Sequence, residues 1–291
     1  MKNTYVIGLL LLSVIFTGCA NKKVNQYHAF SQAGQAYSDA IIELTQQAGN
    51  AAIDADSQIL IQLRKSLDQS DRSNIYPQHT NELVGILSNL RIFREHTGLL
   101  KKYFGVLSTL SEQGQTADID TSTNTLVTAL TTLSPSLINA TVGGSKVSDL
   151  IKASPSFLIG SFQNKALENE LKINARTIER ELSLQQAYLN ALAKDLESDL
   201  QAVINTKAFQ EVATPYINSG NLPKGWAENR RQSLSSIVVM GSVNNAKKAA
   251  DDLNKLFVAL VSNKATDTEI EAAFGSINEI LDLVEMFKSN T

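Results

Sequence analysis

The 291-residue chain has little of what many binding proteins need. It contains one cysteine, five prolines and one tryptophan, and 29 acidic residues outnumber 26 basic ones. Without a basic surplus to neutralise phosphates, the composition gives no support for nucleic-acid binding. The scarcity of proline, with only 15 glycines, disfavours a turn-rich β-sandwich. An aromatic content of 6% disfavours a platform for stacked bases or sugars.

Motifs for catalysis and cofactor binding are also missing. The chain has no Gly-rich phosphate loop, no Gly-x-Ser-x-Gly and no His-Glu-x-x-His. Its three histidines, His28, His79 and His96, are not spaced as the ligand pairs of zinc or di-iron sites. We therefore expect no catalytic residues, no metal and no cofactor. An enzyme would require His79 and His96 to converge with carboxylates in space.

Two acidic patterns resemble sites only superficially. The spacing of a calcium loop occurs at Asp118, Asp120, Ser122 and Asn124. The glycine and the glutamate that such a loop needs are replaced by Thr123 and Ala129, so a polar connection over 116–124 is expected. Carboxylate pairs such as Glu179 and Glu181 are two residues apart on an expected helix. Such residues do not face each other, which favours a solvated face.

The N-terminus has the pattern of an export signal. Lys2 precedes an apolar run from Tyr5 to Phe16, and small residues follow it. Twelve residues are too few to span a bilayer as a helix, which takes about twenty. A basic start, a short apolar run and small residues are typical of a secretory signal peptide. The sequence therefore predicts a signal peptide over residues 1–18.

Phe16-Thr17-Gly18-Cys19 resembles the lipobox of bacterial lipoproteins. The resemblance covers about the first twenty residues and departs from the usual pattern in having Phe16 in place of leucine. It implies that Cys19 becomes the acylated first residue and that the chain is membrane-anchored. Because Cys19 is the only cysteine, an exported chain has no disulfide. Ala20 resembles the outer-membrane sorting pattern of Gram-negative lipoproteins, which implies an outer-membrane location facing the periplasm.

Beyond Cys19, hydrophobic spacing predicts helices throughout. From Tyr27 to Ala55, apolar and small residues recur at alternating intervals of three and four, as in a coiled-coil seam. Gly34 and Ala48 would let a partner helix approach closely. We expect helices over 24–69, 80–113, 163–212 and 227–262, and a last helix from Thr266, with Asp71 to Gln78 as a break around Pro77.

The middle of the chain is more broken than the rest. Ser134-Pro135 and Ser154-Pro155 each have the pattern of a helix start, with serine as N-cap and proline at the first helical position. No stretch alternates clearly enough to predict a strand. The sequence predicts an all-α, elongated antiparallel bundle of long amphipathic helices. Its organisation would be a signal peptide over 1–18, a lipidated N-terminus and tether over 19–23, and a bundle over 24–291 with a middle hairpin near 134–162.

Two functions fit this organisation. The first is a non-enzymatic interaction or scaffolding module, anchored to the membrane through Cys19, with an envelope protein as partner. The alternative is a membrane-perturbing or pore-like component that uses the region 134–162, although its Lys146, Asp149 and Lys152 would be costly inside a bilayer. Trp226, at a turn between two helices, would either anchor a partner or close the end of the bundle.

Overall fold

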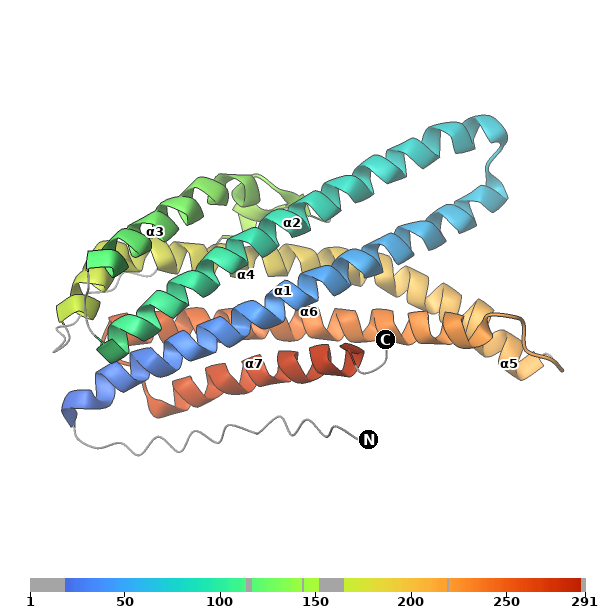
Figure 1. Ribbon diagram of the computed structural model, residues 1–291. Coiled ribbons are helices and arrows are strands. Elements are labelled where there is room, and N and C mark those ends of the chain that lie inside the picture. The colour runs from blue at the N-terminus through green and yellow to red at the C-terminus, as the bar shows by residue number, and fades with distance from the viewer. Residues whose placement is uncertain (1–18, 114–116, 143, 152–164, 219, 289–291) are drawn as a thin grey trace, which may run out of the picture.

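The structure, a computed structural model, is an elongated helical bundle (Figure 1). It describes residues 19–113, 117–142, 144–151, 165–218 and 220–288. The long helices are α1 (Cys19–Ser66), α2 (Gln69–Gln113), α3 (Ala117–Ile138), α4 (Lys165–Lys207), α6 (Trp226–Val261) and α7 (Asp267–Lys288). The expected all-α fold of long antiparallel helices is therefore confirmed.

Short elements join these helices. Strands β1 (Thr141–Val142) and β2 (Ser145–Lys146) pair antiparallel and precede a 3-10 turn, η1 (Val147–Leu150). A π-helical segment, η2 (Ala208–Ala213), follows α4 directly and leads into the single-turn helix α5 (Thr214–Asn218). The strand pair was not expected from the sequence, since two-residue strands are too short to show an alternating pattern.

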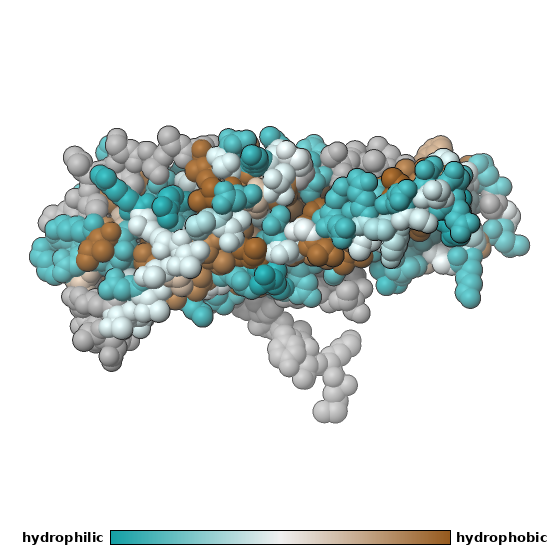
Figure 2. All heavy atoms as spheres, turned by 90° about the horizontal axis from the view of Figure 1, so that it is seen from above, coloured by the Kyte–Doolittle hydropathy of each residue, from teal (hydrophilic) through white to brown (hydrophobic). Residues whose placement is uncertain are grey.

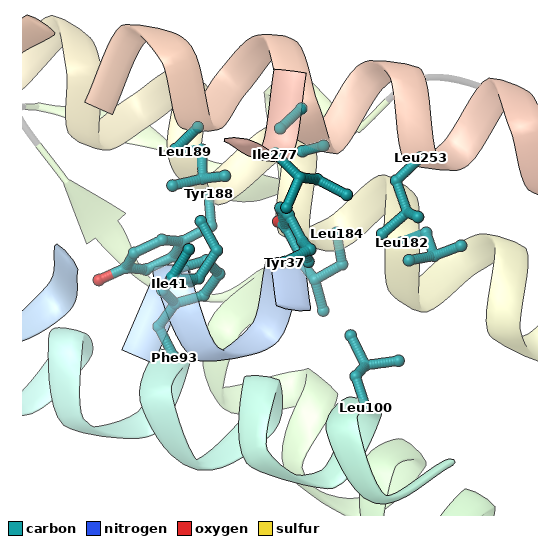
Figure 3. Packing of buried hydrophobic residues seen from close by; sticks show 14 of the residues in the cluster. Tyr37, Ile41, Phe93, Leu100, Leu182, Leu184, Tyr188, Leu189, Leu253 and Ile277 are labelled. Carbon is teal, nitrogen blue, oxygen red and sulfur yellow. The ribbon is translucent and has the colours of Figure 1, made fainter. Parts of the chain in front are cut away.

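α4 lies at the centre of the bundle, in contact with α1, α2, α3 and α6. Figure 3 shows how the core is filled around it by side chains from several helices. Phe93 of α2 stacks on Tyr188 of α4 with ring centroids 4.1 Å apart. Ile41 of α1 lies beside this pair, and Leu253 of α6 closes the core from another side. The buried cluster runs along most of the bundle and stabilises it by removing apolar surface from water.

The small residues of α1 act as the sequence predicts. Gly34 and Ala48 are buried, and α2 packs directly against this stripe. A Cβ atom placed on Gly34 would lie 2.5 Å from Cγ of Phe104 on α2. The Phe104 ring also packs edge-on against Phe30 of α1, with centroids 5.5 Å apart. The missing side chain at Gly34 is thus what allows an aromatic ring to seat on α1.

Two helix boundaries differ from expectation. Pro77 lies inside α2, whose first residue is Gln69, so the expected break over 71–78 is wrong. The turn is instead at residues 67–68, where the Asp68 carboxylate accepts the backbone N–H of Asp71 at 2.9 Å and caps α2. Similarly, Pro135 lies inside α3, so Ser134 does not cap a helix start.

α7 begins at Asp267, next to Thr266, from which the sequence predicts the last helix. The Thr266 backbone N–H donates to the Glu269 carboxylate at 2.8 Å, and the Glu269 N–H donates back to the Thr266 hydroxyl at 3.3 Å. This reciprocal capping box satisfies two backbone donors that would otherwise lack partners.

Candidate functional site

The hairpin arm, by which we mean residues 56–89 at the end of α1 and the start of α2, extends beyond the core. None of these 34 residues, all of which the structure describes, has a buried side chain. The last buried residue of α1 is Ala55, and the first of α2 is Leu90. In Figure 1 the arm projects away from the bundle at the end opposite the start of α1.

The outside of this arm carries apolar side chains. Tyr76 is 63% exposed, Val84 59% and Ile61 52%. In the space-filling view from above, hydrophobic side chains lie among hydrophilic ones along the length of the molecule, including its narrow end (Figure 2). The inner seam of the arm is only half-buried, because two helices alone cannot enclose it. The arm therefore offers apolar surface that another helical element could cover.

A second projection, the aromatic tip, comprises residues 208–238: η2, α5, the following turn and the first turns of α6. Trp226 is half-buried there, and its indole N–H donates to the Val212 carbonyl at 2.9 Å. Tyr216 stacks on the indole with centroids 5.7 Å apart, and the Arg230 guanidinium lies 5.7 Å from the ring. Trp226 thus packs at the end of the bundle, which confirms one of the two expectations for it.

The core contains a polar layer centred on Glu181 of α4. Oε2 of Glu181 accepts a hydrogen bond from Nε2 of His96 at 3.0 Å and one from the Ser134 hydroxyl at 2.5 Å. Its Oε1 accepts from Nε and Nη2 of Arg180, at 3.2 and 2.8 Å. His96 and Glu181 have no exposed side-chain surface, and Ser134 is buried. Three helices are joined through this one carboxylate.

The surrounding bonds fix the proton on His96. The Gln185 amide oxygen accepts from the Tyr37 hydroxyl at 3.3 Å. Its Nε2 therefore faces Nδ1 of His96, at 2.7 Å, and can only donate. With Nδ1 accepting, the ring proton lies on Nε2 and is donated to Glu181. Both ring nitrogens of His96 therefore have partners, and one of them is the Glu181 carboxylate.

This environment shifts the pKa of Glu181. Burial alone raises the pKa of a carboxyl group, but hydrogen bonds from His96, Ser134 and Arg180 outweigh burial and hold the pKa of Glu181 below its usual value. The carboxylate is therefore the form that the folded protein stabilises.

Serine, histidine and glutamate meet here in an order that does not activate a nucleophile. In a catalytic triad the histidine accepts the serine proton, and the acid orients the histidine. Here the Ser134 hydroxyl donates to Glu181, while both nitrogens of His96 are engaged elsewhere. All three groups are sealed in the core. The arrangement instead suits a structural role, in which buried polar contacts fix how the three helices align along one another.

The other histidines lie elsewhere. His79 of the hairpin arm contacts Asp56, with 2.6 Å between Nδ1 and Oδ1, and His28 lies 3.3 Å from Glu112. The three histidines each meet a carboxylate but do not come together. Within the described ranges, no three His, Cys, Asp or Glu side chains gather to hold a metal ion.

Two sequence interpretations of acidic residues are corrected. The polar stretch expected as a connection is mostly helical, since α3 begins at Ala117. The expected solvated face of α4 is wrong at Glu168, Glu170, Glu179 and Glu181, all of which are buried. They are buried because α4 is surrounded by other helices. Glu170 accepts from the Tyr103 hydroxyl at 2.9 Å, and Glu179 accepts from the Ser183 hydroxyl at 2.9 Å.

The predicted attachment residue Cys19 is the first residue of α1, so residues 19–23 continue directly into the bundle as helix. The described part of the region 134–162 packs inward, with Leu137, Val142 and Val147 in the common core. Residues 152–164 lie outside the described residues, as do 1–18. None of the described helices is long and apolar enough to cross a membrane.

One small pocket of about 30 Å³ lies where the start of α1 meets the end of α6; its lining includes Lys23, Tyr27 and Asn263. That volume holds about one water molecule. Comparison with known proteins found no matching family, no similar curated protein and no similar solved structure.

Proposed function

We propose that the chain is a lipid-anchored envelope protein that binds another protein rather than catalysing a reaction. It would be held through an acylated Cys19 in the outer membrane, facing the periplasm. Its partner would be a second envelope protein that docks on the hairpin arm. The single observation that carries this proposal is the arm itself, with 34 consecutive residues and no buried side chain.

The physical argument starts from the stability of helices. Isolated helices are marginal in water, and most helical stability in proteins comes from packing an apolar face. Beyond its base, which contacts the core and β1, the arm packs along its own seam and leaves Ile61, Tyr76 and Val84 at its surface. A helical segment laid across these residues would bury them and complete the packing that the bundle provides elsewhere. We therefore expect the partner to present an amphipathic helix.

The position of the arm suits an anchored protein. α1 begins at Cys19 and, with 48 residues, extends for about 72 Å before its end in the arm. A lipid at the start of α1 would thus place the arm well away from the membrane surface. Two or three acyl chains, as the resemblance implies, would make attachment effectively permanent, since each buried methylene contributes about 0.8 kcal/mol.

Replacing Cys19 with serine is expected to abolish membrane attachment. The serine hydroxyl cannot form the thioether that carries the lipid, so the variant should leave the membrane fraction and incorporate no labelled palmitate. Ala20→Ser, which keeps the thiol, is the matched control and should fractionate as the wild type does. Membrane retention of Cys19→Ser, together with no label in the wild type, would refute the anchor.

The partner site can be tested with a photo-crosslinking amino acid. Placed at Tyr76 or at Ile61 on the arm, it should give the same discrete adduct with one envelope protein in cells. The control position is Ile173 on the body of α4, which is 70% exposed and so equally accessible. The docking proposal fails if all three positions give the same products, or if the arm positions give none.

A further inference from the structure

The aromatic tip exposes apolar side chains at the very end of a helical pair. Ile217 is 74% exposed, Phe209 67% and Tyr216 66%. Leu222, in the turn before α6, is 46% exposed. These residues lie in three successive short elements rather than along one helix face, and η2 is a π-helical segment, a feature found often at functional sites.

The side chains present are those that favour the boundary between lipid and water. Tryptophan and tyrosine concentrate at that boundary because their rings are apolar and their N–H and O–H groups are polar. At the tip, Trp226 and Tyr216 form one stacked pair, with Phe209 and Ile217 exposed in the adjoining η2 and α5. Because these side chains gather at a projecting end, they suit a broad surface such as a bilayer.

The charge at the tip complements anionic headgroups. Residues 208–238 contain Lys224, Arg230 and Arg231, all exposed, against two carboxylates. One of these, Glu228, already pairs with Arg231 at 3.4 Å. The tip is thus locally basic in a chain whose formal net charge is −3. Each lysine or arginine near an anionic membrane surface strengthens binding.

The tip lies at the end of the molecule opposite Cys19. Leu260 of α6 lines the small pocket together with Tyr27 of α1, so the last turn of α6 lies beside the first turns of α1. Trp226 precedes Leu260 by 34 residues on the same helix, which corresponds to about 51 Å. Figure 1 shows α5 at the far end from the start of α1.

We propose that the aromatic tip binds the surface of a bilayer that contains anionic lipids. The exposed aromatic and aliphatic side chains enter the interfacial layer, and the cationic side chains of Lys224 and Arg230 contact phosphates. A chain anchored at Cys19 would then touch a second membrane with its other end. That bridging rests on the proposed anchor, whereas binding by the tip does not.

The single tryptophan makes the tip directly observable. We would mix the Cys19→Ser chain over residues 19–291, which lacks the predicted signal peptide and cannot be acylated, with vesicles of phosphatidylcholine containing 30% phosphatidylglycerol. Emission of Trp226 should shift to shorter wavelength, and lipids brominated near the headgroup end of the acyl chain should quench it. Vesicles of phosphatidylcholine alone, or 0.5 M salt, should weaken binding by ten-fold or more, because cationic attraction is lost or screened.

Variants test whether the tip, and not another part of the chain, binds the vesicles. Ile217→Ser combined with Leu222→Ser should weaken vesicle binding about ten-fold or more, because both changes remove apolar surface that would enter lipid. Arg230→Gln should weaken it about five-fold, the ratio that corresponds to about 1 kcal/mol. Ile173→Ser, at an equally exposed position on the bundle body, is the matched control and should bind as the parent does. Circular dichroism confirms that each variant is folded.

The result that overturns the proposal is emission of Trp226 that neither shifts nor is quenched by anionic vesicles. A shift produced by a lipid-free envelope protein fraction, and not by vesicles, would also overturn it and assign the tip to a protein. Equal losses of vesicle binding in Ile173→Ser and in Ile217→Ser combined with Leu222→Ser would also overturn the proposal. Because the chain tested here carries no lipid, none of these outcomes bears on the palmitate test of Cys19.

Discussion

Replacing Glu181 with leucine is expected to lower the free energy of unfolding by about 3–5 kcal/mol. The variant leaves the Nε2 proton of His96 buried without an acceptor, which is the costly way to break a buried polar pair. The cost of the lost hydrogen bond is smaller at Ser134, because its hydroxyl can still donate to the Leu130 carbonyl. Urea unfolding followed by circular dichroism measures the loss. The variant should unfold at a lower midpoint concentration of urea, while the slope of free energy against urea stays the same.

Two further variants show whether the loss comes from the polar layer. Glu197→Leu changes an exposed carboxylate on the same helix and should alter stability by less than about 0.5 kcal/mol. Adding His96→Leu to Glu181→Leu removes the orphaned donor and should recover at least about 1 kcal/mol. If the double variant is less stable than Glu181→Leu, the cost lies in packing volume and the hydrogen-bond argument is wrong.

The same carboxylate predicts a pH dependence with a definite sign. Because its folded pKa is held below its unfolded value, Glu181 contributes stability that is fully present above the unfolded pKa, about 4.3. That contribution is lost as the pH falls through the unfolded value and then through the folded one. Wild-type stability should therefore decline more steeply below about pH 5 than that of Glu181→Gln, and the two should converge in acid.

The sequence could predict the long helices because their seams repeat. Residues such as Tyr37 and Ile41 on α1, and Leu182 and Leu189 on α4, are buried as their spacing indicates. A repeating apolar stripe identifies a helix and its core face without knowledge of the partner. The helix start at Thr266 and the small residue at Gly34 also follow from local patterns, and the structure confirms both.

The polar layer could not be predicted in the same way, because it depends on how many helices surround α4. A stripe pattern assumes one buried face, whereas α4 is enclosed on several sides and buries Glu181 with its neighbours. One signal was present. The twelve residues 182–193, immediately after Glu181, contain no charged side chain, which indicates a helix segment without a solvent face.

The expected break at Pro77 failed for a related reason. Proline is costly inside a helix, but it does not determine by itself where a helix begins. Asp68 with Asp71 supplied a better start signal, because an aspartate at the N-cap satisfies a free backbone N–H. Because no residue of α2 from Gln69 to Asn89 is buried, no tight packing against the body constrains the helix around Pro77.

The second large effect is expected at Gly34, where alanine should lower the free energy of unfolding by about 2 kcal/mol. The added Cβ would lie 2.5–2.6 Å from three atoms of the Phe104 ring. Phe104 packs against Phe30, and its ring is fully buried, so it has no space into which to move. Overpacking of this kind costs about 1–3 kcal/mol, more than the gain in helix propensity of alanine over glycine.

A second glycine gives a control of opposite sign. A Cβ at Gly98 of α2 would meet no atom within 4 Å, so Gly98→Ala should raise stability by about 0.5–1 kcal/mol through helix propensity alone. Adding Phe104→Leu to Gly34→Ala should make the alanine less costly than it is beside the intact ring. If Gly34→Ala stabilises the chain as Gly98→Ala does, then α1 and α2 do not pack as closely as described. The sign of the change in the free energy of unfolding of Gly34→Ala therefore tests whether these two helices, which also form the hairpin arm, pack closely.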